Sequence, residues 1–277
     1  MLLYRSVGFP ARAAACAVLA AAPATLLATS LAMSLANAPA ANGIELAHAR
    51  AGGYPYPQHL APVRSGDYFA LHCAQACVLK KTRVSLPAAT IATVDGPAPG
   101  LSVRSRPFVP SLFLVRGLPG LREGPVKTWY ANARFQRQPG AEPAKPLQPL
   151  QSRSVDIDGA PLQIDGRVEA VLDQACAEYG QCERYPRITW TVRFGEMKRT
   201  LAVLGGNSNV ESPIPIEDFL VWVGDLDGDG KPDLVVRPQE LDRGLEMALY
   251  LSSELAPGKP WKPAATFHFW DPAQYVC

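Results

Sequence analysis

The chain has 277 residues, of which 27 are lysine or arginine and 25 are aspartate or glutamate, so its formal net charge is +2. This length is enough to bury a sizeable core in one domain or two small ones. The sequence has no basic block and no alternation of arginine with aromatic residues, so the usual signature of a nucleic-acid-binding protein is missing. It also has no basic amphipathic helix of the kind that lies on membrane surfaces.

The N-terminus has the pattern of a signal peptide. Arg5 and Arg12 precede an uncharged run rich in alanine and leucine over residues 13–36. Ala38-Pro39-Ala40 fits the small-x-small cleavage pattern, and Ala36-Asn37-Ala38 is a competing site. The run is long enough for a membrane anchor, but its alanine content and the cleavage pattern favour a cleaved signal peptide over residues 1–40. We therefore predict a periplasmic or secreted protein with no stable membrane span after cleavage.

Cleavage near Ala40 would remove two arginines and no acidic residue, which leaves 25 basic and 25 acidic residues. Lipid attachment at Cys16 is not expected. Arg12 lies only four residues before this cysteine, and the apolar run follows the cysteine instead of preceding it. The mature chain is therefore predicted to be formally neutral and free of a lipid anchor.

Five cysteines remain after cleavage, and an oxidising compartment would allow two disulfides. We predict pairs between Cys73 and Cys77 and between Cys176 and Cys182, because short loops close readily. Cys277, the last residue, is then left over. A zinc site is less favoured, because neither spacing is the two-residue one and no histidine pair supplies further ligands.

The first part of the mature chain is predicted to be unstructured and the rest to form strands. Residues 41–65 are rich in alanine, glycine and proline, which predicts an extended, mobile arm, and residues 66–277 are predicted to form a β-rich domain. The elements expected first in this domain are the unit Tyr68 to Leu86, a loop with Pro97, Pro99 and Pro107, and short strands over residues 111–116 and 125–131.

Four prolines in residues 136–150 are incompatible with regular structure and predict a long loop or an internal domain boundary. Asp158-Gly159 and Asp165-Gly166 follow, and such dipeptides mark tight turns between strands. We favour that role over a second calcium site, because the spacing of these aspartates does not match a calcium loop. Residues 168–179 are predicted to form a short helix with Val168, Val171, Leu172 and Cys176 on one side.

Residues 187–204 have the clearest hairpin pattern. Gly195-Glu196 suits a two-residue type II′ turn in the middle. Residues 245–251 and 264–270 are predicted as closing strands. Taken together, the elements predict an all-β or β-dominated fold of antiparallel hairpins, as a sandwich or a small propeller-like assembly. In the hairpin, residues predicted to be buried alternate with residues predicted to face solvent. The predicted buried residues are Ile188, Trp190, Val192 and Phe194, and the predicted solvent-facing residues are Thr189, Thr191 and Arg193.

The strongest chemical signal is the stretch Val223 to Val236, VGDLDGDGKPDLVV. Four carboxylates within nine residues repel one another unless a cation neutralises them. Calcium suits them because it takes six to eight oxygen ligands of mixed type, and Gly230 can adopt the positive φ of a sharp turn. The predicted calcium ligands are the side chains of Asp225, Asp227, Asp229 and Asp233 and the backbone carbonyl of Lys231.

This loop is not a full EF-hand, because position twelve is Val236 instead of glutamate and its flanks have the pattern of strands. The string GDLDGDGKPDLVV resembles the calcium loop of FG-GAP and VCBS-type repeats, and the match covers all four aspartates and Gly230. The resemblance implies a loop joining two strands of a β-hairpin. It does not extend to a propeller, because no second copy is present. The ion is expected to brace the hairpin in preference to bridging a ligand.

No catalytic motif stands out. The four histidines are His48 and His59 in the predicted arm, His72 beside a predicted disulfide, and His268 in a predicted strand. The glutamates Glu183, Glu196, Glu211, Glu217 and Glu240 have no context that marks a catalytic pair. The five tryptophans, which could stack on sugar rings if exposed, are predicted to lie mainly in the core: Trp129, Trp190, Trp222, Trp261 and Trp270.

These features favour an exported, calcium-binding, non-catalytic protein with a protein partner in the cell envelope. The layout also resembles bacterial periplasmic proteins with one DxDxDGxxD hairpin and a cysteine-tipped tail, some of which are immunity proteins that inhibit peptidoglycan-cleaving enzymes. That resemblance implies an inhibitor, and the proline-rich loop 136–150 is the expected contact. A calcium-dependent carbohydrate-binding or adhesion module and a secreted hydrolase remain as alternatives.

Overall fold

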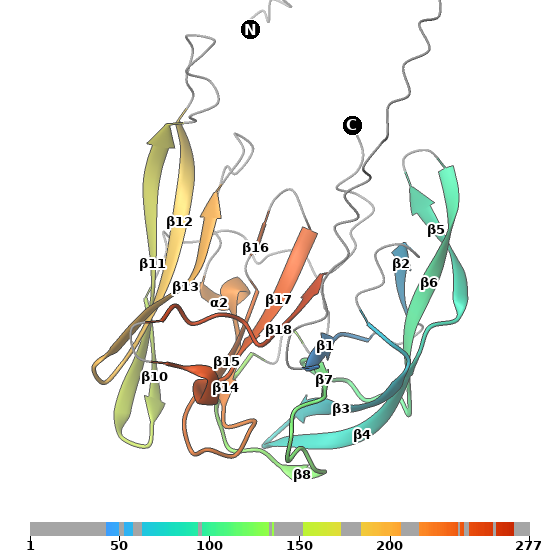
Figure 1. The fold of residues 1–277 in the computed structure, drawn as a ribbon, viewed down its shortest axis with the longest axis horizontal. Helices are drawn as coiled ribbons and strands as arrows, with labels where there is room; N and C mark the ends of the chain where they lie inside the picture. The colour runs from blue at the N-terminus through green and yellow to red at the C-terminus, as the bar shows by residue number, and fades with distance from the viewer. Residues whose placement is uncertain are drawn as a thin grey trace, which may run out of the picture. The chain divides into compact units, whose positions relative to one another are not determined.

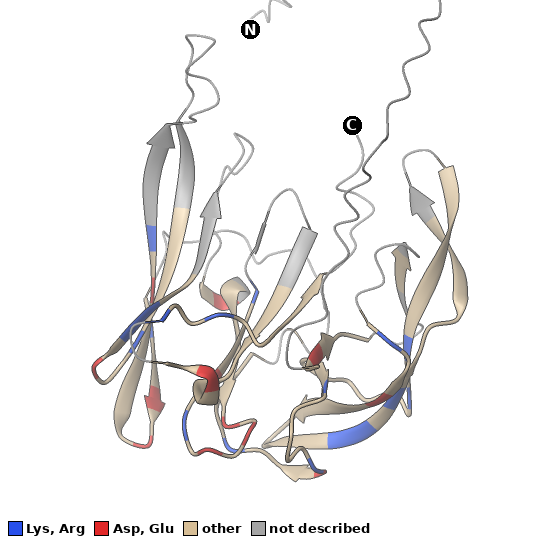
Figure 2. Cartoon of the chain, viewed as in Figure 1, with Lys and Arg blue, Asp and Glu red and all other residues tan. Residues whose placement is uncertain are grey.

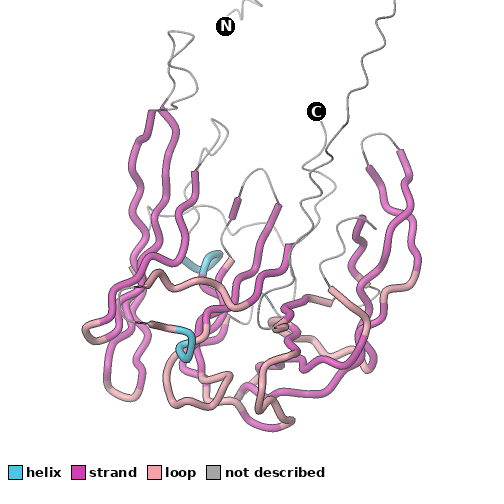
Figure 3. The backbone as a smooth tube through the Cα atoms, in the orientation of Figure 1, coloured by secondary structure: helices cyan, strands magenta, loops and turns pink. Residues whose placement is uncertain are grey.

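The computed structural model describes residues 43–49, 53–57, 63–93, 96–132, 135, 152–172, 184–205, 216–237, 239–240, 244–256 and 259–268. All of them belong to the unit formed by residues 37–277. Strands dominate this part of the chain (Figures 1 and 3), and every strand pair in it is antiparallel. The predicted β-dominated fold of antiparallel hairpins is therefore confirmed.

The first sheet has the order β1-β7-β3-β4-β6-β2, with β5 paired to β6 and β8 paired to β4. The predicted unit Tyr68 to Leu86 forms its central hairpin, and a disulfide joins Cys73 to Cys77 across the turn. The strands of this sheet are β1 (Glu45–Ala47), β2 (Tyr54–Pro57), β3 (Gly66–Cys73), β4 (Cys77–Ser85), β5 (Ala88–Thr93), β6 (Gly96–Arg106), β7 (Leu114–Arg116) and β8 (Gly124–Pro125).

Two sequence predictions differ from the structure here. Residues 41–65, predicted as an extended, mobile arm, include β1 and β2, which pair with β7 and β6, and Leu46 and Ala47 are buried. The loop predicted around Pro97 and Pro99 is instead the β5–β6 hairpin. These prolines lie two residues apart, so their missing N–H groups fall on one side of the strand and the ladder on the other side is kept.

The second sheet is a meander in the order β10-β11-β12-β13. Asp158 (φ 51°) and Gly159 (φ 90°) connect β10 to β11 with the two positive φ values of a type I′ turn. The predicted turn at Asp165-Gly166 is wrong, because both residues lie inside β11 and pair with β12. The predicted helix is wrong over residues 168–172, which continue β11; its remainder lies outside the described residues. The bounds are β10 (Arg153–Ile157), β11 (Ala160–Leu172), β12 (Arg184–Phe194) and β13 (Met197–Gly205).

The β12–β13 hairpin follows the predicted alternation. Ile188, Trp190 and Val192 are buried, and the Trp190 ring stacks on Phe219 with centroids 4.1 Å apart. Gly195 has a positive φ of 56°, as the first central residue of a type II′ turn requires.

The third sheet has the order β16-β17-β15-β14-β9, with β18 paired to β17. Its alternate residues enter two different hydrophobic cores: Val235 packs with residues of the first sheet, whereas Leu234 and Val236 pack with residues of the second. A sheet buried on both faces has a nearly continuous apolar sequence. Its elements are β9 (Thr128–Ala131), the short helix α2 (Ile216–Phe219), β14 (Leu220–Gly224), β15 (Asp233–Val236), β16 (Gln239–Glu240), β17 (Gly244–Tyr250), the 3₁₀ turn η3 (Ser252–Glu254) and β18 (Ala265–His268).

Candidate metal site

The predicted calcium loop joins β14 to β15, the two central strands of the third sheet. The antiparallel ladder runs down to the pair Gly224 and Asp233, so residues 225–232 form the loop between them. Gly228 and Gly230 both have φ of 80°, and a Cβ atom at either position would meet nothing within 4 Å. Glycine is therefore required there by the backbone conformation and not by lack of space.

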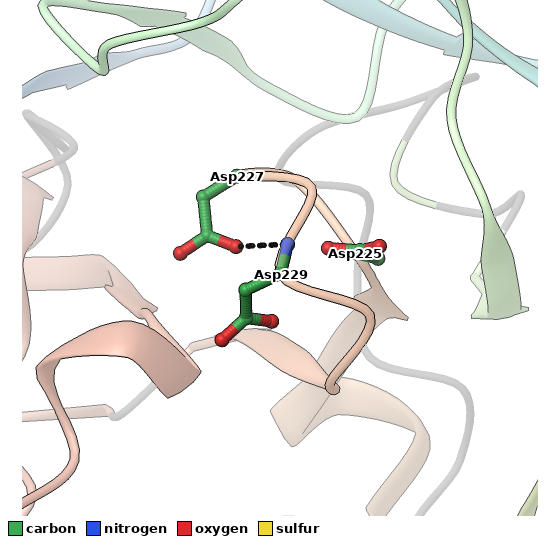
Figure 4. Close-up of side chains that lie close together, drawn as sticks. All are labelled: Asp225, Asp227 and Asp229. Carbon is green, nitrogen blue, oxygen red and sulfur yellow. Dashed lines mark hydrogen bonds between the residues drawn. The ribbon is translucent and has the colours of Figure 1, made fainter.

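The loop brings three of the four predicted carboxylates together (Figure 4). Oxygen atoms of Asp225, Asp227 and Asp229 all lie within 4.8 Å of one another. Asp227 accepts a hydrogen bond from the Asp229 amide (3.2 Å), and Asp229 accepts one from the Lys231 amide (2.8 Å). These bonds orient the side chains toward one another and leave oxygen lone pairs for a further ligand.

Asp225 provides a test of whether this cluster fits a cation. Its Oδ2 accepts a hydrogen bond from the Gly230 amide (3.0 Å). Its Oδ1 is shielded from solvent and has no hydrogen-bond partner. An unsatisfied buried carboxylate oxygen costs on the order of 1–3 kcal/mol or more, and a bound cation would remove that cost. The residues present therefore fit a metal ion.

Asp233 follows the loop as the first residue of β15 and has a different environment. It is fully buried, and its two oxygens accept hydrogen bonds from the amides of Leu226 (2.7 Å) and Ser252 (2.7 Å). Burial raises the pKa of Asp233 to about 7, although the Ser252 amide lowers it, and the charge of Asp227 raises it further. Asp233 is outside the three-residue cluster. Its role as a calcium ligand, and that of the Lys231 carbonyl, stay predictions.

The turn η3 contributes contacts that the sequence did not indicate. Ser252 Oγ lies 2.9 Å from both carboxylate oxygens of Asp229, and Ser253 Oγ donates to Asp227. These serines are more than twenty residues from the aspartates they contact. Nothing in the sequence around them marks a metal site, since only the return of β17 beside β15 places them there.

The donor set favours a particular class of ion. The clustered side chains offer carboxylate oxygens alone, and the two serines that contact them offer hydroxyl oxygens. Hard cations such as calcium prefer oxygen ligands, whereas zinc in structural sites takes cysteine and histidine. When bound, such an ion would neutralise the mutual repulsion of the three carboxylates and hold the loop closed.

The other predicted site residues are dispersed. The Cys73–Cys77 disulfide is formed, whereas Cys176, Cys182 and Cys277 lie outside the described residues. His48 is buried in the first sheet's core region, and the ring of the more exposed His72 lies 2.6 Å from the Pro110 carbonyl. His59, Trp270, Glu183, Glu211 and the loop 136–150 also lie outside the described residues.

The tryptophans do not form a sugar-stacking platform within the described residues. Trp190, Trp222 and Trp261 are buried. Trp129 is partly exposed, but the Lys127 ammonium lies 5.0 Å from its ring centroid, and its indole N–H donates to Asp158 (3.2 Å). One face of this ring is therefore in contact with the Lys127 ammonium.

Comparison with protein-family models, curated proteins and solved structures gives no match. The likeness of the aspartate loop to FG-GAP and VCBS-type repeats therefore stays a resemblance of one motif. Among the described residues, no helix is long and apolar enough to cross a membrane.

Proposed function

We propose that this chain is an exported, calcium-stabilised binding protein without catalytic activity, whose partner is a protein of the cell envelope. The observation that carries the calcium assignment is the cluster of Asp225, Asp227 and Asp229 with the unpartnered, shielded Oδ1 of Asp225. Calcium is the ion class that this all-oxygen set suits best.

The ion would act on the fold by bracing the third sheet. The loop begins and ends in strands that are buried on both faces, and η3 contacts it from the end of β17. A cation shared by the three carboxylates would therefore fix the ends of β14 and β15 against η3. This bracing role requires no substrate at the ion.

Export is supported by the N-terminal sequence pattern and by the Cys73–Cys77 disulfide, since such bonds persist in oxidising compartments. The class of partner rests on the sequence resemblance to immunity proteins, and we propose a peptidoglycan-cleaving enzyme as that partner. In a cell-wall turbidity assay, stoichiometric addition of the mature protein should slow such an enzyme. Unchanged lysis by every envelope hydrolase tested would contradict this assignment.

Calorimetric titration of the purified protein tests the calcium assignment. Asp225→Asn should weaken calcium binding by about 100-fold or more, beyond what even the hydrogen-bonding partners of metal ligands contribute. Glu196→Gln is the matched control, because Glu196 is an exposed acid in the β12–β13 turn, and its affinity should equal that of the wild type. Unchanged affinity in Asp225→Asn would show that the site is wrong.

A further inference from the structure

The outer face of the first sheet carries an unusual pair of like charges. Arg83 on β4 lies directly opposite Arg106 on β6, and Ser85 lies opposite Arg104 in the same ladder. The intervening residues Val84 and Ser105 are buried, so the arginines and Ser85 point to the solvent side of the sheet. We call Lys81, Arg83, Arg104 and Arg106 the basic face; blue segments on β4 and β6 mark it in Figure 2.

In the part of the chain that the structure describes, no carboxylate lies within ion-pair distance of these four cations. None of its four cations forms an ion pair there, and Arg104 only donates to Ser102 (3.4 Å) on its own strand. Arg193 provides a contrast. It also lies opposite a like charge, that of Lys198, but its Nε lies 3.6 Å from a carboxylate oxygen of Asp165. Directly opposed like charges destabilise a sheet, so the Arg83–Arg106 pair is unfavourable for folding.

We propose that the basic face is the surface that binds the partner and that it recognises a carboxylate-rich patch of a protein. This inference rests on the proposed function, because it assigns a location to the binding activity. Arginine suits this role because its planar guanidinium group matches carboxylates in a bidentate manner and because arginine is enriched at protein interfaces.

Two neighbouring features favour a protein over a uniformly anionic surface. Asp67 on β3 lies directly opposite Arg83, and the Glu123 carboxylate accepts a hydrogen bond from the Lys81 amide (2.9 Å). These acids would be repelled by a lipid headgroup layer, whereas a protein can present a matching cation. The hydroxyl of Thr82 on β4 donates a hydrogen bond to the Pro107 carbonyl. The next residue, Phe108, is 42% exposed. Phe108 is thus an exposed aromatic residue two positions after Arg106, and aromatic residues are enriched at protein interfaces.

Arg106→Glu separates binding from folding, because the two effects have opposite signs. A carboxylate at this position would lie opposite Arg83 and replace a repulsive cross-strand pair with an attractive one. The midpoint of thermal unfolding should therefore rise, while affinity for the partner falls. Lys262→Glu is the control for charge, because it changes the net charge by the same amount and Lys262 is exposed in the segment before β18.

The experiment uses the full-length chain in an exporting bacterial host, with a photo-crosslinking amino acid in place of Ser85. The crosslinked protein is identified and purified, and its affinity for each variant is measured at physiological salt. We expect an acidic protein to be captured and Arg106→Glu to bind it about tenfold more weakly. The lysine control should bind like the wild type.

Three outcomes would overturn the proposal: no protein crosslinks at position 85, Arg106→Glu binds the captured protein as tightly as the wild type, or the wild type binds vesicles rich in phosphatidylglycerol instead. Calcium titrations of the same variants should be unchanged. The proposal for the basic face can therefore be rejected while the proposed calcium site is retained. Calcium titration can likewise reject the calcium site while the basic face is retained.

Discussion

At the scale of single residues, Glu45 shows how a polar side chain can hold an outer strand in place. Its carboxylate accepts hydrogen bonds from Tyr68 (2.6 Å) and Arg116 (2.7 Å) and pairs with Arg64. Although burial alone would raise the pKa of Glu45, the bonds from Arg116, Tyr68 and Arg64 hold it below its usual value of 4.5. The network ties β1 to β3 and β7.

The lowered pKa gives a pH dependence with a defined sign. Because the carboxylate is more acidic in the folded state than in the unfolded state, its stabilisation is present above about pH 4.5 and is lost as the pH falls below that value. Glu45→Gln should cost about 2 kcal/mol at neutral pH, since hydrogen bonds to charged groups are worth about 1.5–3 kcal/mol each. Urea unfolding at pH 7 and pH 3 measures the difference.

The difference in free energy of unfolding between Glu45→Gln and the wild type should be smaller at pH 3 than at pH 7. The control Glu196→Gln should have the stability of the wild type at both pH values. A difference that stays constant with pH would mean that the Glu45 charge does not stabilise the fold. Sequence reasoning missed this residue, because it lies in a segment whose alanine and glycine content predicted a mobile arm.

At the scale of elements, η3 is the part of the structure that links the aspartate loop 225–232 to the end of β17. Ser252 uses its hydroxyl on Asp229 and its amide on Asp233, so a single residue contacts two loop carboxylates. Ser252→Ala removes only the hydroxyl contact. We expect calcium affinity to fall by about tenfold, the lower end of what hydrogen-bonding partners of metal ligands contribute.

Ser154→Ala is the matched control, because Ser154 is an exposed serine in β10 on the second sheet. Calcium titration by calorimetry checks both variants. Ser252→Thr should retain most of the affinity, since it keeps the hydroxyl. If Ser252→Ala binds calcium with the affinity of the wild type, η3 lies beside the site without contributing to calcium affinity.

The elements that the sequence predicted well are those that carry a local signal. The β12–β13 hairpin has a strict alternation and a glycine turn, and Asp158-Gly159 forms a turn as its dipeptide predicts. Asp165-Gly166 has the same composition but lies in the middle of β11, where the two residues pair with Thr191 and Trp190 of β12. Pairing with β12 outweighs the turn preference there, which is a tertiary effect invisible in the local pattern.

The candidate site was predictable only in part for the same reason. The spacing of Asp225, Asp227 and Asp229 lies within one loop, and the structure brings these three together. Asp233 completes the motif four residues after Asp229, yet it is the first residue of β15 and its carboxylate accepts hydrogen bonds from backbone amides. Whether an acid faces the loop centre or the sheet depends on where the strand begins, and element boundaries are poorly defined by sequence.

At the scale of the whole described unit, the third sheet decides the architecture because it contributes to both cores. Trp222 packs edge-on against Phe113 of the first core at 5.8 Å, while Tyr250 packs against Trp261 of the second core at 5.6 Å. Strands buried on both faces lack an alternating pattern. The division of their residues between two cores was therefore not readable from the sequence.

The aspartate loop 225–232 joins two strands of this shared sheet, so binding of an ion there should stabilise the whole described unit. Thermal unfolding of the mature protein with calcium and with chelator tests this expectation. With calcium at about a hundred times its dissociation constant, binding should add about 3 kcal/mol to the free energy of unfolding and raise the midpoint in a single transition. Asp225→Asn should unfold at the same midpoint in both conditions. A wild-type midpoint that does not respond to calcium would show that the loop does not stabilise the fold by binding this ion.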